Sequence, residues 1–481
     1  MRLHRLILLI KVYKNMLDFL PLDDKALMLK DYFEKSEISF CDLSVGVRYM
    51  WRDDYEVDYA IYKDVLYLKE TTKDYKDFFY FPISLNGQTS GLNELEKYCI
   101  ERGTPLNFCC IDNLTVAQLS SLYPYIEVYN DRDWNDYIYD AEKFKTFSGK
   151  KYGGQRNHVN KFKKTYPNYT VKVLEESDNQ SVFSMLEKFD KGQDFSLWSA
   201  ESERKKIKEY IVNAKTLGQS GIVVYVDGQV VGFSIGERVK DTLIVHVEKG
   251  LKEYEGVYPF IASEFVKAFW TSEVKYLNRE EDCGDNGLRI SKLQYRPIEI
   301  KQKNFVKVKK LSDKFLTPNQ KIDHELSVSE ILAKDKKIYA KIYLDEQLNA
   351  MWGYDFRQDL GKAKPTPDYF FQFQKSLKDK REEFSLALRL NGKMIGELVY
   401  HNFDFYGGVE IGFRVRKEFQ NKGYAYRGVK FLIEYAFDTL KAKKVKAKCY
   451  LNNTPSMNLL KKVGFSMASQ DQTYYYFELI K

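Results

Sequence analysis

An amide side chain and small residues precede an amphipathic segment near the C-terminal end of the sequence. The stretch FQNKGYAYRGV, residues 419–429, follows the alternating run GGVEIGFRV and precedes the apolar helical pattern VKFLIEYAF. A helix start leaves about four backbone N–H groups unpaired and carries roughly half a positive charge. Small residues in the preceding turn let a phosphate group come close. We therefore expect an anion, such as the diphosphate of a nucleotide cofactor, to bind the loop formed by Gln420, Asn421, Lys422, Gly423, Tyr424 and Ala425.

A second group of polar residues follows the apolar segment VKYL in the middle of the chain. Many ionisable groups in a short span favour a cleft with paired charges, because a buried charge is costly unless it has a partner or binds a ligand. We expect a cleft that holds a polar or charged ligand, and a structural network of salt bridges is the alternative. The group consists of Asn278, Arg279, Glu280, Glu281, Asp282, Arg289, Lys292 and Tyr295.

A basic cluster within residues 150–164 has two interpretations. It suits a polyanion such as the acceptor stem of a tRNA, or it is a solvated helix face. The chain has five histidines, and no two of them have the spacing of metal ligands, so we expect no metal site. The cluster is made of Lys150, Lys151, Arg156, His158, Lys161, Lys163 and Lys164.

Length and composition predict roughly three domains in these 481 residues. The net charge of +8 permits an anionic partner without requiring one, and we expect no DNA partner. The six cysteines lack a C-x-x-C pair, which is typical of reduced thiols in a cytoplasmic protein. No apolar run approaches the roughly 20 residues of a membrane span. We interpret residues 1–15 as a short surface helix or as an upstream start before Met16, not as a secretory signal.

Three similar successions of strand and helix patterns divide the chain. Each contains a predicted hairpin, and the turns fall at Lys63–Asp64, Asp227–Gly228 and Asn391–Gly392. The Lys-rich residues 302–325 are the best linker candidate. We predict an α+β fold with three lobes, each a mixed β-sheet flanked by helices. The predicted lobes are residues 1–148, 149–310 and 326–481.

The second and third lobes can be aligned by pattern. DGQVVGFSIGE matches NGKMIGELVYH, and EYEGVYPFIASEF matches QNKGYAYRGVKFL. Gly256 takes the place of Gly423, but Glu255 replaces Lys422 and Tyr258 replaces Ala425. An acidic and bulkier loop should bind a diphosphate poorly. We therefore expect only the third lobe to bind one.

The loop Gln420-x-x-Gly423-x-Ala425 resembles the diphosphate loop of the GNAT acyltransferases, Q/R-x-x-G-x-G/A. About thirty residues on, Asn453-x-x-Ser456 followed by Gly464–Phe465 resembles the second signature of that family. The resemblance covers residues 330–481, and so the third lobe is expected to be GNAT-like. It implies that acyl-CoA, in particular acetyl-CoA, binds as co-substrate. It also implies that the loop amides hold the pyrophosphate, that Asn453 and Ser456 belong to the cofactor site, and that a splayed strand at Phe413, Arg414 and Val415 pairs its backbone with the pantetheine arm.

The same resemblance suggests how protons move. An amine acceptor must lose a proton to attack a thioester, and the thiolate that leaves must regain one. Glu410 lies where GNAT members often place an acid that relays a proton, although a surface or salt-bridged carboxylate is the alternative. Lys461 stands where many relatives carry a general-acid Tyr, which leaves the general acid open, with Tyr474, Tyr475 and Tyr476 as possible substitutes. Trp352 and Asp355, in NAMWGYDFRQDL, would shape the cleft for a cationic amine, or else belong to a half-buried helix.

Residues 16–300 resemble a different family, named for the C-terminal domain of phosphatidylglycerol lysyltransferase. The stretches that carry this resemblance are residues 136–162, VHVEKG at 245–250 and residues 276–297. It implies two GNAT-like lobes in tandem and an aminoacyl- or acyl-transfer fold. The membrane domain of the lipid-modifying members has no counterpart in this sequence.

The sequence therefore predicts acetyl-CoA-dependent N-acetylation of a small-molecule or peptide amine by the third lobe. The alternative is aminoacyl transfer from a charged tRNA, to a lipid or peptide acceptor, by the first two lobes. A third possibility is that those lobes are a substrate-binding module without catalysis. Ligand residues in the second lobe would then be Arg279, Glu280, Asp282, Arg289 and Lys292.

Overall fold

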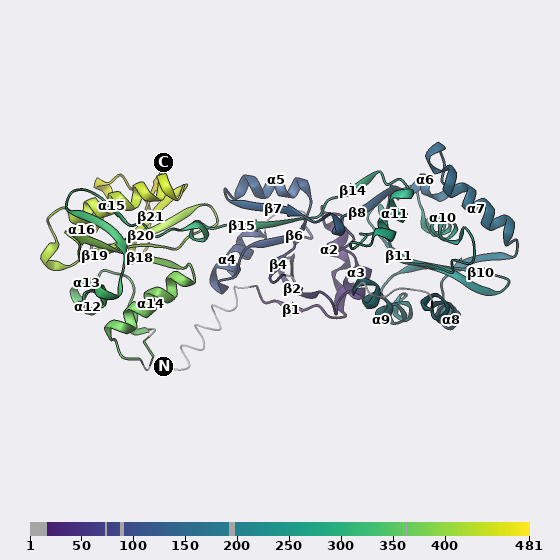
Figure 1. Cartoon of the computed structure of the whole chain (residues 1–481), viewed down its shortest axis with the longest axis horizontal. Coiled ribbons are helices and arrows are strands. Elements are labelled where there is room, and N and C mark those ends of the chain that lie inside the picture. Colours follow the sequence, from purple (N-terminus) through teal and green to yellow (C-terminus); the bar gives the residue numbers. More distant parts are fainter. Residues whose placement is uncertain (1–16, 73–74, 87–90, 192–197, 359, 362) are drawn as a thin grey trace. The chain divides into compact units, whose positions relative to one another are not determined.

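The computed structural model describes residues 17–72, 75–86, 91–191, 198–358, 360–361 and 363–481 (Figure 1). The N-terminal segment for which we expected a surface helix lies outside the described residues. The chain forms two compact units. The first contains the described residues up to Gln118 together with Val128–Lys307, and the second contains Leu119–Glu127 together with Val308–Lys481.

The first sheet has the strand order β1-β2-β3-β4-β6-β15-β7, and β5 pairs with β3. The hairpin predicted at Lys63–Asp64 is confirmed, and the helix Leu92–Arg102 ends at Gly103 in a left-handed turn. The strands are β1 (Leu20–Pro21), β2 (Glu56–Tyr62), β3 (Val65–Thr71), β4 (Phe78–Phe79), β5 (Ile83–Ser84), β6 (Asn107–Ile111), β7 (Ile126–Asn130) and β15 (Asn304–Val308). The helices around them are α2 (Lys30–Lys35), α3 (Val45–Met50), α4 (Leu92–Arg102) and α5 (Asn113–Leu122).

The linker expected at residues 302–325 is wrong in its first part. Strand β15 pairs with β6, with Val306 opposite Phe108, and both side chains are fully buried. The lysines of this segment alternate with apolar residues, so the high charge hid a strand with one buried face. The chain therefore returns to the first sheet after it has built the second.

The second sheet has the order β14-β8-β13-β12-β11-β10-β9. Helices α6, α7 and α10 cover one face, and α8 and α9 lie on the other (Figure 1). Strand β8 precedes the lobe boundary that we predicted at residues 148–149, so the two sheets do not divide there. The strands are β8 (Asp136–Asp140), β9 (Tyr169–Val173), β10 (Ser220–Val226), β11 (Gln229–Val239), β12 (Thr242–Gly250), β13 (Tyr276–Asn278) and β14 (Glu299–Lys301). The helices are α6 (Ala141–Thr146), α7 (Gly153–Thr165), α8 (Asn179–Asp190), α9 (Trp198–Asn213), α10 (Val257–Phe269) and α11 (Asn286–Gln294).

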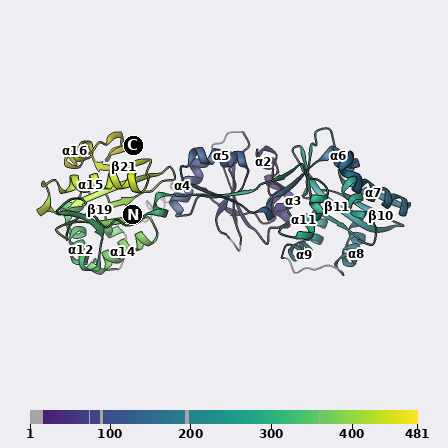
Figure 2. The same cartoon turned by 45° about the horizontal axis from the view of Figure 1, so that its top comes forward.

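The third sheet, in the second unit, has the order β16-β17-β18-β19-β20-β21-β23-β22. Helices α15 and α16 cover one face, and α12 and α14 cover the other (Figures 1 and 2). The strands are β16 (Gln320–Lys321), β17 (Leu326–Glu330), β18 (Glu383–Leu390), β19 (Lys393–His401), β20 (Gly408–Val415), β21 (Lys444–Tyr450), β22 (Ser466–Gln470) and β23 (Tyr474–Ile480). The helices are α12 (Lys336–Leu344), α13 (Glu346–Asn349), α14 (Pro367–Asp379), α15 (Tyr424–Glu434) and α16 (Thr454–Lys462).

The repeat between the second and third lobes extends to their irregularities. In the hairpin β10–β11 the register shifts at Val224–Tyr225, three residues before the turn at Asp227. In β18–β19 it shifts at Leu388–Arg389, again three residues before the turn at Asn391. A shared bulge position is a strong sign of a common backbone plan, because a bulge changes the face to which every later side chain points.

Each of these two sheets contains one parallel pair that diverges. Strand β12 pairs with β13 only over residues 242–244, and β20 pairs with β21 only over residues 408–410. Together with the parallel pair β4–β6 of the first sheet, these pairs make all three sheets mixed, and the α+β prediction is confirmed. In the described residues, no helix has the length and apolar character needed to cross a bilayer.

Candidate active site

A cavity of about 400 Å³ opens where β20 and β21 diverge in the C-terminal unit. Predicted site residues from separate segments of the third lobe line this cavity together, namely Trp352, Glu410, Phe413, Asn453 and Ser456. Two further acids and a histidine lie in the same wall, and we did not anticipate them: Glu382, Glu383 and His401. The cavity therefore combines an apolar cleft with titratable side chains, which is the usual composition of a small-molecule site.

The predicted diphosphate loop lies at the start of α15. Gly423 is the residue before the helix and has φ +77, a left-handed conformation that glycine adopts without strain. No side chain caps the helix, and a Cβ at Gly423 would meet no atom within 4 Å. The Gln420 side chain donates a hydrogen bond to the Val415 carbonyl (2.8 Å), which ties the loop to the end of β20. The start of α15 therefore has no side-chain cap and has free space beside Gly423, both of which an anion at a helix start requires.

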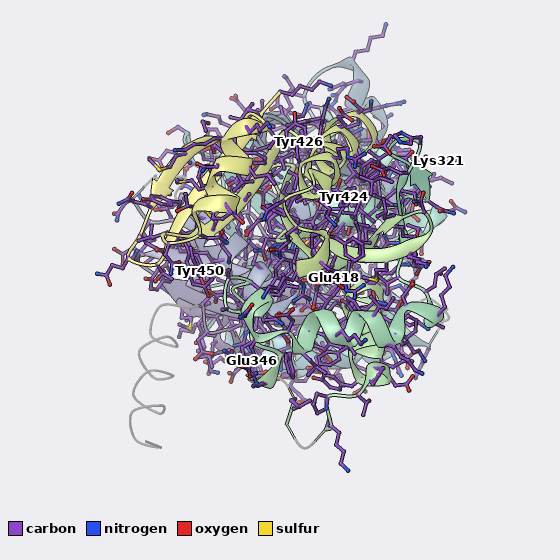
Figure 3. The ribbon with its side chains drawn as sticks, turned by 90° about the vertical axis from the view of Figure 1, so that its left-hand side faces the viewer. Lys321, Glu346, Glu418, Tyr424, Tyr426 and Tyr450 are labelled. Carbon is purple, nitrogen blue, oxygen red and sulfur yellow. The ribbon has the colours of Figure 1, made fainter. Side chains whose placement is uncertain are left out.

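The remaining loop residues are placed around this helix start. Asn421 has φ +57, which asparagine tolerates better than most residues, and Lys422 donates to the Glu418 carbonyl (2.9 Å). Tyr424 and Ala425 are half-buried against the apolar core of the sheet. Figure 3 views the chain from the side of the C-terminal unit and labels Glu418, just before the loop, and Tyr424, within it.

The second predicted motif forms the start of another helix. The Asn453 side chain accepts a hydrogen bond from the Ser456 backbone N–H (3.2 Å) and so caps α16. An N-cap amide is a structural requirement in itself. Both residues nevertheless line the cavity, so a cofactor role for them stays a prediction.

Glu410 is the last residue of β20 that pairs with β21. Its side chain is 14% exposed, and it accepts a hydrogen bond from the Asn402 amide (2.9 Å). The His401 Nε2 lies 3.8 Å from one carboxylate oxygen, and the Lys448 ammonium lies 4.0 Å from the same oxygen. A half-buried carboxylate between a histidine and a lysine in a cavity wall is suited to exchange protons with a bound ligand.

Of the two residues predicted to shape the acceptor cleft, Trp352 lines the cavity and Asp355 does not. The Trp352 ring packs on Gly412 and lies 4.4 Å from the Arg414 guanidinium, so it belongs to the cavity. Asp355 is exposed and hydrogen-bonds the Arg357 backbone N–H (3.0 Å), and it does not line this cavity. The structure therefore brings Trp352 to the site and leaves Asp355 outside its lining.

Arg414 has a buried side chain with its own partners. It binds the Glu397 carboxylate (2.7 Å) and the Asn349 side-chain oxygen (2.6 Å). Only its backbone is available to a ligand along β20, as for Val415, whose side chain is buried in the core. The Phe413 side chain lines the cavity.

The candidates for the general acid lie outside the cavity lining. Lys461 is exposed on α16. The Tyr476 hydroxyl donates to Asp471 (2.7 Å), and Tyr475 packs against the core cluster. Tyr474 stacks on Tyr450 with ring centroids 4.6 Å apart. The identity of the general acid remains a prediction to be tested.

The charged residues of the second lobe have internal partners. Arg279 binds Glu248 (2.7 Å), and Glu280 binds the His246 ring (2.6 Å). Asp282 is fully buried and accepts hydrogen bonds from Arg132, Arg289 and Tyr137. Asn278 donates to Asp136 (2.7 Å), and Lys292 donates to the backbone carbonyls of Arg279 (2.6 Å) and Glu281.

This pairing agrees with the salt-bridge alternative. Of this group only Tyr295 lines the cavity of about 770 Å³ at the start of α10 in the second lobe. A ligand role for Arg279, Glu280, Asp282, Arg289 and Lys292 is still a prediction, and the proposed function does not depend on it.

Part of the basic cluster is engaged within the lobe. Lys161 binds Glu255 (2.5 Å), and Arg156 donates to the Gly149 carbonyl (2.6 Å). Lys151 and His158 are exposed and line the 770 Å³ cavity. Both interpretations of the cluster, the polyanion and the solvated face, stay open.

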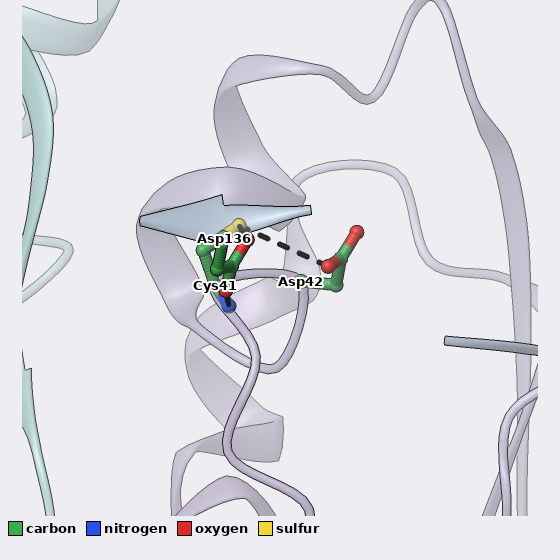
Figure 4. Close-up of side chains that lie close together, drawn as sticks. All are labelled: Cys41, Asp42 and Asp136. Carbon is green, nitrogen blue, oxygen red and sulfur yellow. Dashed lines mark hydrogen bonds between the residues drawn. The ribbon is translucent and has the colours of Figure 1, made fainter. Parts of the chain in front are cut away.

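Three potential metal ligands lie together in the first unit, Cys41, Asp42 and Asp136 (Figure 4). The Lys303 ammonium already lies among them, 2.6 Å from Asp42, 2.7 Å from Asp136 and 3.2 Å from the Cys41 sulfur. Burial raises the pKa of the Cys41 thiol well above its usual value, and so do the nearby carboxylates of Asp136 and Glu281. A neutral thiol is a poor metal ligand. Lys303 therefore supplies the positive charge of this cluster.

Comparisons with known proteins agree with this geometry. The acetyltransferase (GNAT) domain family matches residues 328–466. The uncharacterized N-acetyltransferase YnaD of Bacillus subtilis is 29% identical over 118 residues, which are 23% of this chain and 69% of that protein. The C-terminal unit thus contains a GNAT acetyltransferase domain, and the chain is an acyltransferase with an acyl-CoA co-substrate.

The N-terminal unit gives the chain its family. The family described as phosphatidylglycerol lysyltransferase, C-terminal, matches residues 33–306, more than half of the chain, and the chain belongs to it. An uncharacterized protein of Mycoplasmoides gallisepticum is 27% identical over 236 residues, which are 47% of this chain and 74% of that protein. A solved structure of a conserved protein of unknown function from Bacteroides thetaiotaomicron is 28% identical, covers 61% of this chain and 100% of that one, and has a TM-score of 0.55. Both resemblances predicted from the sequence are confirmed.

Proposed function

We propose that the C-terminal domain transfers the acetyl group of acetyl-CoA to an amine acceptor. The observation that carries this proposal is the uncapped start of α15 at Gly423, close in sequence to a diverging strand pair whose cavity contains Glu410. The helix start would hold the diphosphate through its backbone N–H groups. The free edge of β20 beyond Glu410 would pair with the pantetheine arm, because β21 no longer occupies it there.

The acceptor is a cationic amine, either a small molecule or the amino group of a peptide. The cavity wall opposite the strands is aromatic, with Trp352, Tyr354 and Phe373, and the strands contribute Glu383 and Glu410. Aromatic faces and carboxylates both attract an ammonium group. An anionic acceptor would instead meet two carboxylates at close range.

Glu410 is the proposed general base. It would take a proton from the bound ammonium, and the free amine would then attack the thioester carbonyl. Its hydrogen bond from Asn402 fixes the orientation of the carboxylate. Trp352, packed on Gly412, would hold the acceptor against this strand.

A second activity is proposed for the N-terminal unit, namely aminoacyl transfer from a charged tRNA. It is supported by membership of the phosphatidylglycerol lysyltransferase C-terminal family and by the 770 Å³ cavity, which has basic residue types in its wall. These are Lys151, His158, Lys252 and Arg296. The runner-up for this unit is a binding module without catalysis. We also propose a cytoplasmic location, because all six cysteines are free thiols.

The test uses the full chain, with acetyl-CoA as donor and two acceptor probes, phenethylamine and a tetrapeptide with a free N-terminus. Calorimetry measures acetyl-CoA binding, and mass spectrometry detects the acetylated product. Binding of acetyl-CoA together with acetylation of either probe supports the proposal. Failure of the chain to bind acetyl-CoA at millimolar concentration would overturn it. Aminoacyl transfer is tested separately with lysyl-tRNA and phosphatidylglycerol vesicles.

A further inference from the structure

Three titratable side chains form a row across three neighbouring strands of the third sheet. Glu383 on β18 lies directly opposite His401 on β19, and His401 lies directly opposite Glu410 on β20. Side chains at directly opposite positions of antiparallel strands point to the same face, with Cβ atoms about 4.5–5.5 Å apart. All three line the 400 Å³ cavity. The row thus begins at the proposed base and extends by two strands toward the edge of the sheet.

The three side chains of the row are only partly exposed to solvent, and each has polar or charged groups beside it. Glu410 lies 3.8 Å from His401 Nε2, and Glu383 accepts a hydrogen bond from the Ser385 hydroxyl (3.1 Å). The charged groups that act on Glu383 are Glu397, Arg414 and Glu382, and those that act on His401 are Glu410 and Lys448. Glu382, directly before Glu383, is exposed. The Glu383 end of the row therefore lies beside an exposed carboxylate, Glu382, which also lines the cavity.

Burial changes the proton affinities along this row. It raises the pKa of Glu383 to about 7, and the Glu397 carboxylate acts in the same direction, against the Ser385 hydrogen bond and Arg414. Burial and Lys448 lower the pKa of His401, against the opposite effect of Glu410. Near neutral pH, Glu383 is thus divided between its two protonation forms, and His401 is largely neutral. Both conditions favour proton transfer, which is fastest between groups poised near the working pH.

We propose that His401 and Glu383 are relay residues that carry the acceptor's proton from Glu410 to solvent. This inference rests on the proposed function, because it concerns the same cavity and the same reaction. Ser385 and the neighbouring Glu382 would mark the exit of the relay.

The chemistry balances with one net proton. The ammonium R–NH₃⁺ gives one proton to Glu410, and the amine attacks the thioester carbonyl. The C–N bond forms, the C–S bond breaks, and the second nitrogen proton ends on the thiolate as CoA–SH. The proton taken by Glu410 must leave before the next turnover. It passes to neutral His401, then to the Glu383 carboxylate, and then to water beside Glu382.

A purely structural role for Glu383 makes different predictions from a relay role. A structural carboxylate would affect the melting temperature, and the pH profile would keep its shape. A relay group would set the acidic limb of the profile, because protonated Glu383 blocks the outlet. The matched control is Glu434→Gln, an exposed glutamate on α15 that pairs with Lys430 at 3.7 Å.

The experiment measures kcat at saturating acetyl-CoA and phenethylamine from pH 5.5 to 9 in the full chain, because kcat includes the step that returns Glu410 to its basic form, together with acetyl-CoA affinity and melting temperature. For the unmodified chain we expect an acidic limb near pH 7. Glu383→Gln should move that limb to lower pH by about one unit and lower the plateau about tenfold, with acetyl-CoA affinity unchanged. Glu383→Asp should restore a limb, and Glu434→Gln should match the unmodified chain. His401→Gln should resemble Glu383→Gln, since it interrupts the same row.

Infrared titration gives a readout that needs no acceptor. In the acetyl-CoA complex, part of the protonated-carboxyl absorption that titrates near pH 7 should be lost in Glu383→Gln and persist in Glu410→Gln, whereas Glu281, whose pKa burial also raises to about 7, should contribute equally in both variants. An active chain in which Glu383→Gln leaves the acidic limb in place would overturn the relay alone. A chain that neither binds acetyl-CoA nor acetylates a probe would overturn the proposed function, and the relay with it.

Discussion

The second and third lobes share a backbone plan and differ at the point where their parallel strands diverge. Glu410 is the last residue of β20 that pairs with β21, and Ile244 is the last residue of β12 that pairs with β13. Glu410 faces a cavity, whereas Ile244 is buried in an apolar cluster with Cys41 and Val47 of the first lobe. The comparison shows that the strand divergence alone does not make a site. What fills the divergence decides whether a ligand can enter.

The first lobe closes the second one from this side. Helix α3 approaches so closely that a Cβ on Gly46 would lie 2.3 Å from the His246 ring. The Gly46 backbone N–H donates to Glu237 (2.6 Å), which also binds His246 (3.0 Å). In the second lobe, the region where β12 and β13 diverge thus forms an interface with the first lobe. The charged side chains there stabilise packing.

The helix starts differ in the same sense. Gly423 and Gly256 each have a positive φ and lie directly before a helix, but they differ in how much space lies beside them. A Cβ at Gly256 would lie 2.3 Å from the His158 carbonyl oxygen, whereas Gly423 faces open space. One glycine permits the approach of α7, and the other leaves room for a ligand. The same residue type therefore serves packing in one lobe and, on our proposal, binding in the other.

The largest expected effect is at the open helix start. Gly423→Glu adds bulk and a negative charge where the diphosphate would lie, so calorimetry should detect no acetyl-CoA binding. Gly392→Glu is the matched control, because Gly392 has φ +80 and also faces open space, at the β18–β19 turn. It should bind acetyl-CoA normally. Unchanged affinity in Gly423→Glu would remove the functional distinction between the two lobes.

The next effect concerns the residue that differs at the divergence point. Glu410→Gln keeps the shape of the side chain and removes its basicity, so kcat near neutral pH should fall by roughly 10²–10⁴. Acetyl-CoA affinity should persist. Steady-state kinetics with phenethylamine measure the change, and Glu434→Gln is the control. Near-normal turnover from pH 6 to 9 would reassign Glu410 to structure.

A third change tests whether the second lobe uses its charges for packing. Arg279 is buried beside Glu248, and its loss leaves that carboxylate without its partner. Breaking such a pair typically costs about 3–5 kcal/mol of unfolding free energy. Urea denaturation of Arg279→Ala should show a loss of this size. Tryptophan fluorescence is a suitable probe of unfolding, since four of the five tryptophans lie in the N-terminal unit.

The control for that change is Arg238→Ala, which removes an exposed partner of Glu273. Exposed pairs contribute about 0–1 kcal/mol, so its stability should be nearly unchanged. If Arg279→Ala instead kept its stability and lost a ligand or an activity, the charges around Arg279 would belong to a ligand site and not to packing.

The smallest expected effect is a pH dependence of the N-terminal unit. His246 is buried between Glu237 and Glu280, and their hydrogen bonds raise its pKa to about 9 against the effect of burial. Because the pKa of His246 is higher in the folded state, its protonation stabilises the fold fully below the unfolded-state pKa of about 6.5. This stabilisation is lost as the pH rises through the folded-state pKa of about 9. The unfolding free energy should fall by up to about 3 kcal/mol between pH 7 and 9.5, and the urea midpoint should fall with it. His246→Gln should flatten this dependence, and an equally steep fall in that variant would assign it to other groups.

Local patterns in the sequence were sufficient for much of the fold. The turns at Asp227–Gly228 and Asn391–Gly392 and the alternating strands beside them were correctly predicted, because turn chemistry and side-chain period are local properties. The loop at Gly423 was placed at a helix start for the same reason. Strand β15 in the Lys-rich segment 302–325 was missed, since its pairing with β6 depends on residues almost two hundred positions earlier.

The sequence by itself determined which residue types were present at each motif: a glycine with an amide before it, a carboxylate on a strand, and a dense set of charges after VKYL. Tertiary structure decided what each of them faces. Sheet register aligned Glu383 and His401 with Glu410, although 27 residues separate the ends of that row, and packing of α3 on the second lobe enclosed its charges. The physical reason is that charge and shape are properties of a side chain, whereas exposure and pairing are properties of its neighbours, which the fold brings from distant parts of the chain.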